Sequence, residues 1–250
     1  MVERWIGFTN LSLLEQARAR VIKTLMEGVQ LNMSTEEAKK LLKRHANTKL
    51  NLVIMFVDIN DSTRMSLSLS QDKFALVIQT FAQEIGIAVL GYGGYVFKYE
   101  GDAIVILFPA DFDEVKACEN ALDSSIAILG ILNEVINPIF RTNGLPEITV
   151  RVGMACGYIL VVLYGKSLEN AHIDIIGSSI SLAAKITSIA KANQILLGKN
   201  IYNNLLSSTS KKYSSNRCDF TEIILDVAKW KYLSHFDSRS MYHVYEYLTD

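Results

Sequence analysis

The chain has 250 residues, half of them hydrophobic, and a formal net charge of −1 at pH 7. This length and composition allow a substantial core, and so one large globular domain or one domain with an extension. The charge gives no global attraction to nucleic acid or to an acidic membrane surface, so local groups or a metal would have to hold an anionic ligand. We expect no nucleic-acid partner.

Cysteine usage and hydropathy bear on the compartment. Cys118, Cys156 and Cys218 are odd in number and widely spaced, which is typical of reduced thiols and gives no zinc-binding pattern. The first ten residues, MVERWIGFTN, lack the apolar core of a signal peptide, and the longest apolar run, 153–165, is too short to cross a bilayer as a helix. We expect a cytoplasmic protein with no membrane span.

Two helices are predicted at the start of the chain. Apolar residues recur at spacings of three and four over 11–31, and a capping box that begins at Ser34 opens a second helical pattern. The pattern then changes to a dense β-branched run, LNLVIMFVDI, which is typical of a buried strand. We therefore divide the chain into a helical extension over 1–48 and a main domain over 49–250.

The main domain alternates between strand and helix patterns. A long amphipathic helix precedes two strands joined through Glu100 and Gly101. A second long helix, a strand or hairpin within 148–165, a third helix and the short strand QILLG follow, and MYHVYEYL alternates like a closing strand. The order βαββαβ and then αβ predicts an α+β fold, the ferredoxin-like split βαβ sheet, with helices on one face and an added αβ unit.

Charged and polar residues follow the first strand and occupy the hairpin turn. In a split βαβ fold these two places meet, which brings Asp58 near Asp102; paired carboxylates repel unless one is protonated or a divalent cation lies between them. Ser62 and Thr63 begin a helix, whose free backbone N–H groups attract phosphate. A metal with a phosphate would indicate a nucleotide, although a strand-end cap and a hairpin turn use the same aspartates.

Three segments carry a resemblance to a known family. In order and separation, FVDINDSTRMS, FKYEGDAIVILF and DIIGSSISLAAKI resemble the signature segments of the class III nucleotidyl cyclase catalytic domain, the adenylyl and guanylyl cyclases. The resemblance implies a homodimer with active sites at its interface. There, two Mg²⁺ or Mn²⁺ ions would promote attack of the ribose 3′-hydroxyl on the α-phosphate of a nucleoside triphosphate, with release of pyrophosphate.

The resemblance also assigns residues. Asp58 and Asp102 would hold the metals, with the backbone carbonyl of Ile59 as a further ligand. Lys98 and Asp174 fall where the family reads the base; similar adenylyl cyclases carry this pair, and guanylyl cyclases tend to carry Glu and Cys. A lysine ammonium donates, which suits adenine N1, and an aspartate accepts from the 6-amino group, so ATP is the expected substrate. A solvated strand lysine and a loop cap are the ordinary alternatives.

Three positions depart from the family pattern. Ser181 stands where the family usually has asparagine and Lys185 where it has arginine, the residues that orient the ribose and stabilise the transition state. Lysine keeps the charge but loses the planar fork that contacts phosphate oxygens. Asp61 replaces a usual glycine; it tolerates left-handed backbone but adds negative charge near the triphosphate. We expect a slower enzyme, or one shaped for a different product.

Two alternatives stay open. The first is a class III cyclase with another base preference, either a guanylyl cyclase or one similar to the bacterial antiphage cyclases that make cyclic UMP or cyclic CMP. The second is a degenerate domain that binds a nucleotide or a partner as a regulatory module. The sequence pattern does not specify which residue near the carboxyl-terminal end holds the terminal phosphates; Lys229 and Lys231 are candidates.

Overall fold

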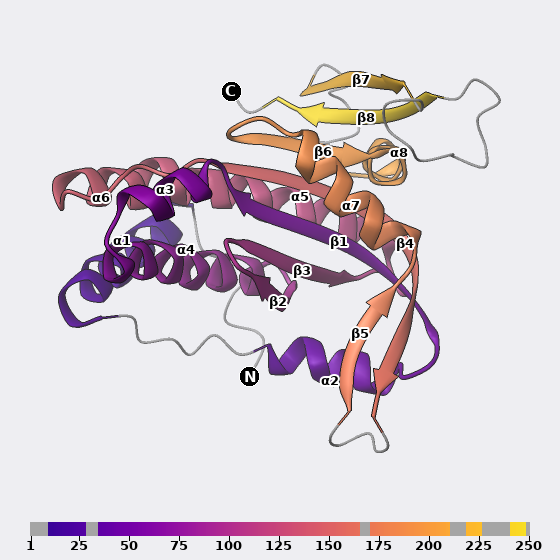
Figure 1. Ribbon diagram of the computed structural model, residues 1–250. Coiled ribbons are helices and arrows are strands. Elements are labelled where there is room, and N and C mark those ends of the chain that lie inside the picture. Colours follow the sequence, from indigo (N-terminus) through magenta and orange to yellow (C-terminus); the bar gives the residue numbers. More distant parts are fainter. Residues whose placement is uncertain (1–9, 29–34, 166–170, 211–218, 227–240, 249–250) are drawn as a thin grey trace.

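A computed structural model of the protein describes residues 10–28, 35–165, 171–210, 219–226 and 241–248. Figure 1 shows a central sheet with helices on both faces. In chain order the elements are α1 (Asn10–Glu27), α2 (Glu36–Arg44), β1 (Lys49–Ile59), α3 (Ser62–Ser68), α4 (Gln71–Gly91), β2 (Tyr95–Glu100), β3 (Ala103–Pro109), α5 (Glu114–Ile131), a π-helical turn (Leu132–Ile136), α6 (Asn137–Thr142), β4 (Val150–Tyr164), β5 (His172–Ile176), α7 (Ser178–Ile189), β6 (Gln194–Gly198), α8 (Lys199–Ser207), β7 (Phe220–Asp226) and β8 (Met241–Tyr247).

The sheet has the predicted topology. Its strands follow the order β2-β3-β1-β4-β6-β8-β7, and β5 pairs with β4 outside this path. All described strand pairs are antiparallel except β4 with β6. The order β2-β3-β1-β4, with α4 and α5 as the two crossover helices, is that of the split βαβ fold. The ferredoxin-like α+β prediction is therefore confirmed, and α7 with β6 is the added αβ unit.

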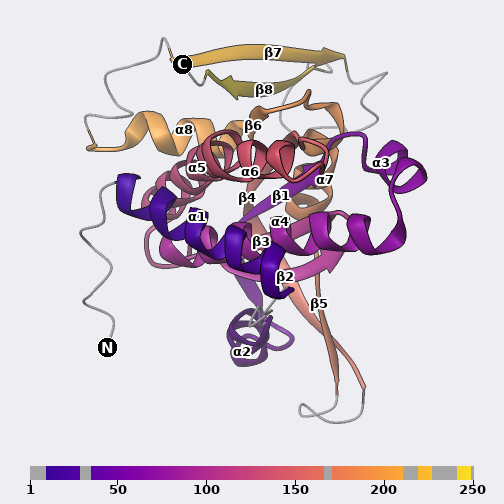
Figure 2. The same ribbon diagram turned by 90° about the vertical axis from the view of Figure 1, so that its left-hand side faces the viewer.

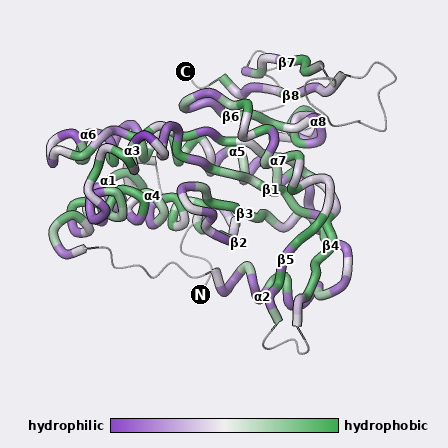
Figure 3. Tube along the Cα trace, in the orientation of Figure 1, coloured by the Kyte–Doolittle hydropathy of each residue, from purple (hydrophilic) through white to green (hydrophobic). Residues whose placement is uncertain are grey.

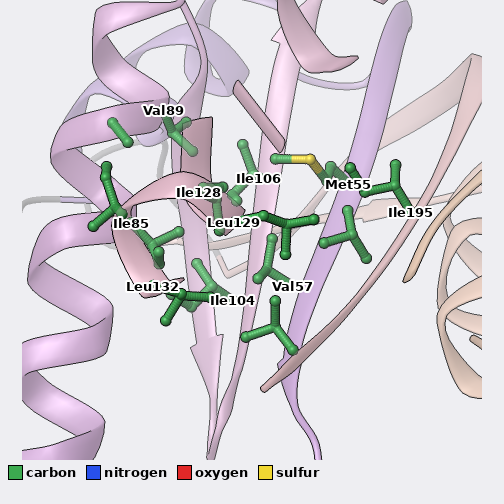
Figure 4. Packing of buried hydrophobic residues seen from close by; sticks show 14 of the residues in the cluster. Met55, Val57, Ile85, Val89, Ile104, Ile106, Ile128, Leu129, Leu132 and Ile195 are labelled. Atoms are coloured by element: carbon green, nitrogen blue, oxygen red, sulfur yellow. The ribbon is translucent and has the colours of Figure 1, made fainter. Parts of the chain in front are cut away.

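The middle of the central strand β1, Leu52 to Val57, is apolar and buried because both faces of the strand are covered. Met55 and Val57 point into one core with residues of α4 and α5, and Ile54 and Phe56 point into a second core on the other face. Figure 4 shows the first core, where Met55 and Val57 lie among residues of β3, α4 and α5. Figure 3 shows the hydrophobic residues concentrated on these central strands and on the inner helix faces.

Helices cover both faces of the sheet, which differs in part from the expectation. The two crossover helices α4 and α5 share one face, as expected, and α1 joins them there through the buried Ala17 and Val21. The other face is covered by α7, through Ala183 and Ile186, and by α2. Figure 2 shows α2 set apart from α1 and α4, below the sheet. The added unit and α2 thus bury the face that the core motif leaves open.

Local details correct some of the predicted boundaries. α2 begins at Glu36, with Thr35 at the N-cap and no side-chain capping hydrogen bond, so the helix starts later than the capping box predicted. Ser34 lies outside the described residues. The predicted strand or hairpin within 148–165 is one long strand, β4, and its antiparallel partner is the separate strand β5. Two further elements, the helix α8 and the edge strand β7, were not predicted from the sequence pattern.

Two helical stretches, Gln71–Gly91 and Glu114–Thr142, have the length and apolar composition of a membrane span. In each, more than half of the apolar window is buried inside the fold, 56% and 61%. This apolar composition is what a core helix needs when it packs on a sheet. The expectation that the chain has no membrane span stays a prediction.

The buried cysteines Cys118 and Cys156 are free thiols, as expected. The third, Cys218, lies outside the described residues.

Candidate active site

The fold brings Asp58 and Asp102 together. Asp58 is the next-to-last residue of β1, and the β1–β3 register places it opposite Ala103, the residue after Asp102. Burial raises the pKa of Asp58; the Arg151 guanidinium lowers it, and the neighbouring Asp102 carboxylate raises it again. The two carboxylates therefore act on each other electrostatically, as the sequence predicted.

Arg151, on β4, is a site residue that the sequence analysis missed. It lies opposite Asp58 in the β1–β4 register, and its guanidinium forms a salt bridge with Oδ2 of Asp58. Its Nε atom is buried and has no hydrogen-bond partner among the described residues. One signal could have found it, since an arginine between the valines of VRV interrupts an otherwise apolar strand. Arg151 holds one oxygen of Asp58 in place.

The start of α3 faces the same region. The side chain of Ile59 is fully buried and is a hydrocarbon, so only its backbone carbonyl could be a ligand. Asp61 is the N-cap of α3 and has a left-handed backbone, with φ of 56°, a conformation that aspartate tolerates better than most residues. Ser62 and Thr63 line an open cavity of about 500 Å³ together with Asp102 and residues of α4. The predicted phosphate-binding segment and one predicted metal ligand thus share a cavity.

The donor set at this place suits a hard divalent cation. Two carboxylates and a backbone carbonyl are oxygen ligands, the kind that Mg²⁺ prefers. Within the described part of the chain, no group of three or more His, Cys, Asp or Glu residues is placed to hold a metal. The protein would therefore supply only part of a coordination shell, which leaves positions for water or for phosphate oxygens of a substrate.

Lys98 and Asp174 form a second pair. Nζ of Lys98, on β2, lies 3.5 Å from Oδ1 of Asp174, on β5, and 2.9 Å from Oε1 of Glu100. Burial lowers the pKa of Lys98, but the two carboxylates outweigh it and the net shift is upward, so the ammonium stays charged. The backbone N–H of Ile175 donates to Asp174 Oδ1. A permanent donor and an acceptor are thus held side by side.

This second pair lies in a different cavity. The cavity measures about 680 Å³ and is lined by residues of α2, β2 and β5 and by nearby loop residues, including Lys98 and Asp174. None of its described lining residues also lines the cavity of Ser62, Thr63 and Asp102. Since α2 and α4 pack on opposite faces of the sheet, the two cavities lie on opposite sides of the β2–β3 hairpin.

The family model described as the adenylate and guanylate cyclase catalytic domain matches residues 45–229. This chain belongs to that family. The match covers most of the chain and contains both pairs described above, so the resemblance that the sequence carries to the class III nucleotidyl cyclases is confirmed.

The relatives that match this chain carry the names of different cyclase activities. The chain is 25% identical over 202 residues to a cytidylate cyclase of Staphylococcus aureus, which covers 73% of this chain and 48% of that protein. It is 25% identical over 161 residues to adenylate cyclase type 10 of Oryctolagus cuniculus, covering 60% of this chain and 10% of the relative. The chain thus spans about half or less of the length of these two relatives.

The fold agrees with solved class III cyclases. The adenylyl cyclase CyaB from P. aeruginosa superposes with a TM-score of 0.64 at 20% identity, over 81% of this chain and 96% of that one. The guanylyl cyclase Cya2 superposes with a TM-score of 0.63 at 15% identity, over 80% and 93%. At these identities the likeness shows the cyclase fold and leaves the base preference open.

Ser181 and Lys185, the two predicted catalytic residues, lie outside both cavities. Ser181 and Lys185 are one turn apart on α7, which begins directly after β5 and Gly177. Ser181 is exposed, and its hydroxyl lies 3.5 Å from the carbonyl oxygen of Gly177. Neither residue lines either of the two cavities. Lys229 and Lys231 lie outside the described residues.

Proposed function

We propose that the protein is a nucleotidyl cyclase for ATP or CTP, whose bases carry an amino group beside a ring-nitrogen acceptor. It converts the triphosphate to the 3′,5′-cyclic monophosphate and pyrophosphate. The observation that carries this proposal is the pair of Lys98 and Asp174, held 3.5 Å apart on the wall of a cavity. Cavities of several hundred Å³ are the size of small-molecule sites.

The chemistry of the pair favours two of the four common bases. The Lys98 ammonium only donates, and the Asp174 carboxylate only accepts. Adenine offers N1 as acceptor and its 6-amino group as donor, and cytosine offers N3 and its 4-amino group in the same order. Guanine and uracil present the reverse order, so in this register their groups would meet a like partner, and buried unpaired groups discriminate strongly. The resemblance to adenylyl cyclases favours ATP, and the cytidylate cyclase among the relatives favours CTP.

The end of β1 and the residues that line the first cavity would together hold the triphosphate end. Asp58, Asp102 and the carbonyl of Ile59 fit the ligands of divalent ions. Two Mg²⁺ or Mn²⁺ ions, when bound, would lower the pKa of the ribose 3′-hydroxyl and neutralise charge on the phosphates. Arg151 would orient Asp58 through its salt bridge. The backbone N–H groups at Ser62 and Thr63 would face phosphate oxygens.

Two copies of the chain are needed for one complete site. In a single chain, Lys98 and Asp174 line one cavity and Asp102 lines another, and the two cavities lie on opposite sides of the β2–β3 hairpin. One nucleotide would therefore take its base contacts from one copy and its metal contacts from the other. We infer a homodimer in which Ser181 and Lys185 of α7 approach the ribose and α-phosphate held by the partner copy.

Product identification tests the proposal. The purified protein is incubated with Mn²⁺ and an equal mixture of ATP, GTP, CTP and UTP, and the products are analysed by mass spectrometry. We expect cyclic AMP, cyclic CMP or both, and none from an Asp102→Ala protein. Cyclic GMP or cyclic UMP as the main product would contradict the base assignment. The absence of any cyclic product would contradict the activity and favour a nucleotide-binding module.

The acid limb of the pH profile should depend on Arg151. Because burial raises the pKa of Asp58, this carboxyl takes up a proton at a higher pH than a free aspartate does, and a protonated carboxyl binds metal poorly. Turnover should therefore fall as the pH drops through that raised pKa. Arg151→Gln removes the group that lowers the pKa, so its acid limb should move to higher pH. Mn²⁺-dependent kcat/KM measured against pH tests this, and superimposable acid limbs in wild type and variant would refute it.

A further inference from the structure

The amphipathic helix α2 takes part in the cavity that holds Lys98 and Asp174. It lies before residue 45, where the family match begins. Ala38 and Leu42 are fully buried and fix α2 to the second core, which includes Phe97 of β2. The helix is thus docked on the strand that carries Lys98, and Figure 1 shows it beside β5 as well. Its position is set by packing, so the side chains beside its apolar stripe have defined places.

One charged stripe of α2 lines the cavity. Glu36, Lys39 and Lys43 are spaced by three and four residues, which places them along one side of the helix, and all three are lining residues. Lys39 is paired with Glu36, with Nζ 2.9 Å from Oε1. The Lys43 side chain makes no hydrogen bond or ion pair with any described residue, and its charge acts on the Glu36 carboxylate only from a longer distance. Among the described lining residues, Lys43 is therefore the lysine whose ammonium has no close partner within the chain.

Lys98 and Asp174 alone do not distinguish cytosine from adenine, although the two bases differ at one further position. Cytosine carries a carbonyl oxygen, O2, next to N3, whereas adenine carries only a C–H at the corresponding place beside N1. A third donor in the pocket would bind the first and gain nothing from the second. A lysine ammonium is such a donor, because it has three N–H groups and no acceptor.

We propose that α2 completes the base pocket formed with β2 and β5, and that Lys43 donates a hydrogen bond to the carbonyl oxygen O2 of cytosine. This contact would make CTP the preferred substrate. This inference rests on the proposed function, because it takes Lys98 and Asp174 as the base-reading pair. It assigns to the helix before the family domain a part in substrate choice. Lys43 is a specificity-determining residue in this account, and Lys98 and Asp174 remain the primary contacts.

The chain offers a matched control on the same helix. Lys40 is an exposed lysine whose Nζ lies 2.7 Å from Oε1 of Glu37, and it does not line the cavity. Lys40→Ala and Lys43→Ala remove the same side chain and the same charge from one short helix. Both variants change the helix propensity and the net charge equally. A difference in their kinetics must therefore come from the position of the lysine on α2.

The test compares CTP and ATP in wild type, Lys43→Ala, Lys43→Arg and Lys40→Ala. We expect Lys43→Ala to lower kcat/KM for CTP by about tenfold through KM, the loss of one charge-assisted hydrogen bond, and to change that for ATP by less than about twofold. Lys43→Arg should recover part of the CTP value, and Lys40→Ala should match wild type. Equal losses for both substrates would indicate a phosphate contact and overturn the proposal, as would a Lys43→Ala protein that behaves like Lys40→Ala.

A binding measurement separates this inference from the proposed function. 3′-Deoxy-CTP and 3′-deoxy-ATP lack the attacking hydroxyl and cannot be cyclised, so isothermal titration with them reads the pocket without turnover. A wild-type preference for 3′-deoxy-CTP that is lost in Lys43→Ala supports the role of α2, even if the protein makes no cyclic product. Equal binding of both nucleotides by wild type overturns it, whatever the activity.

Discussion

Asp102→Asn should lower cyclase turnover by about a thousandfold, because divalent ions held by Asp58 and Asp102 would supply several kcal/mol of transition-state stabilisation at the triphosphate. The amide is nearly the same size as the carboxyl but carries no charge to hold a divalent ion. Asp102 is half-buried in a turn, so the fold should survive. The loss should appear in kcat and in the Mn²⁺ concentration needed for half-maximal rate.

Asp58→Asn should show the same loss of turnover without a loss of stability. Burial and the Asp102 carboxylate raise the pKa of Asp58 by more than Arg151 lowers it, so the folded state disfavours the charged carboxyl and the uncharged amide should not lower the free energy of unfolding. Thermal melting checks this, with a Tm for the Asp58 variant that is no lower than that of wild type. Asp72→Asn, at the exposed start of α4, is the matched control and should change neither rate nor Tm. Near-normal turnover in either active-site variant would refute the metal assignment.

The double variant Lys98→Glu with Asp174→Cys should turn the base preference toward GTP by about a hundredfold relative to ATP and CTP. Glutamate offers an acceptor where the ring nitrogen of guanine carries a hydrogen, and cysteine removes the carboxylate that would repel the guanine O6. These are the residues that guanylyl cyclases tend to carry at the two positions.

The single variant Lys98→Glu is the control for this exchange. It places a third carboxylate beside Glu100 and Asp174, which now lie close to the Lys98 ammonium, so all four triphosphates should be used poorly. Competition assays with pairs of triphosphates measure the ratio directly. A double variant that keeps the wild-type preference would show that Lys98 and Asp174 do not read the base.

Much of the fold and part of the site follow from local patterns in the sequence. The apolar run of β1 and the turn after Glu100 define a strand and a hairpin, and the βαββαβ order then fixes which ends meet. That was enough to place Asp58 beside Asp102. The pairing of Lys98 with Asp174 was expected only through the family resemblance, since the two residues lie on strands far apart in the chain.

Other features depend on register and docking, which local patterns do not contain. Arg151 contacts Asp58 because β4 pairs with β1 in one particular register, and a shift by one residue would turn the arginine to the other face. The amphipathic pattern of α2 showed that one side of the helix is buried, but not that it docks on β2 beside Lys98. The capping box predicted a helix start before Glu36, where the helix begins without a side-chain capping hydrogen bond.

The claim that joins these observations is that each nucleotide lies between two copies of the chain, with Asp58 and Asp102 from one and Lys98 and Asp174 from the other. A complementation assay with two inactive variants tests this claim. Asp102→Asn and Lys98→Ala/Asp174→Ala are each assayed alone and then as an equal mixture with different affinity tags, so that mixed dimers can be isolated.

A mixed dimer would have one intact site, formed by the Asp58 and Asp102 of one variant with the Lys98 and Asp174 of the other. The equal mixture should therefore recover about a quarter of wild-type turnover, since half of the dimers are mixed and half of their sites are intact. Isolated mixed dimers that stay as inactive as either parent would contradict the claim and place the whole site within one chain.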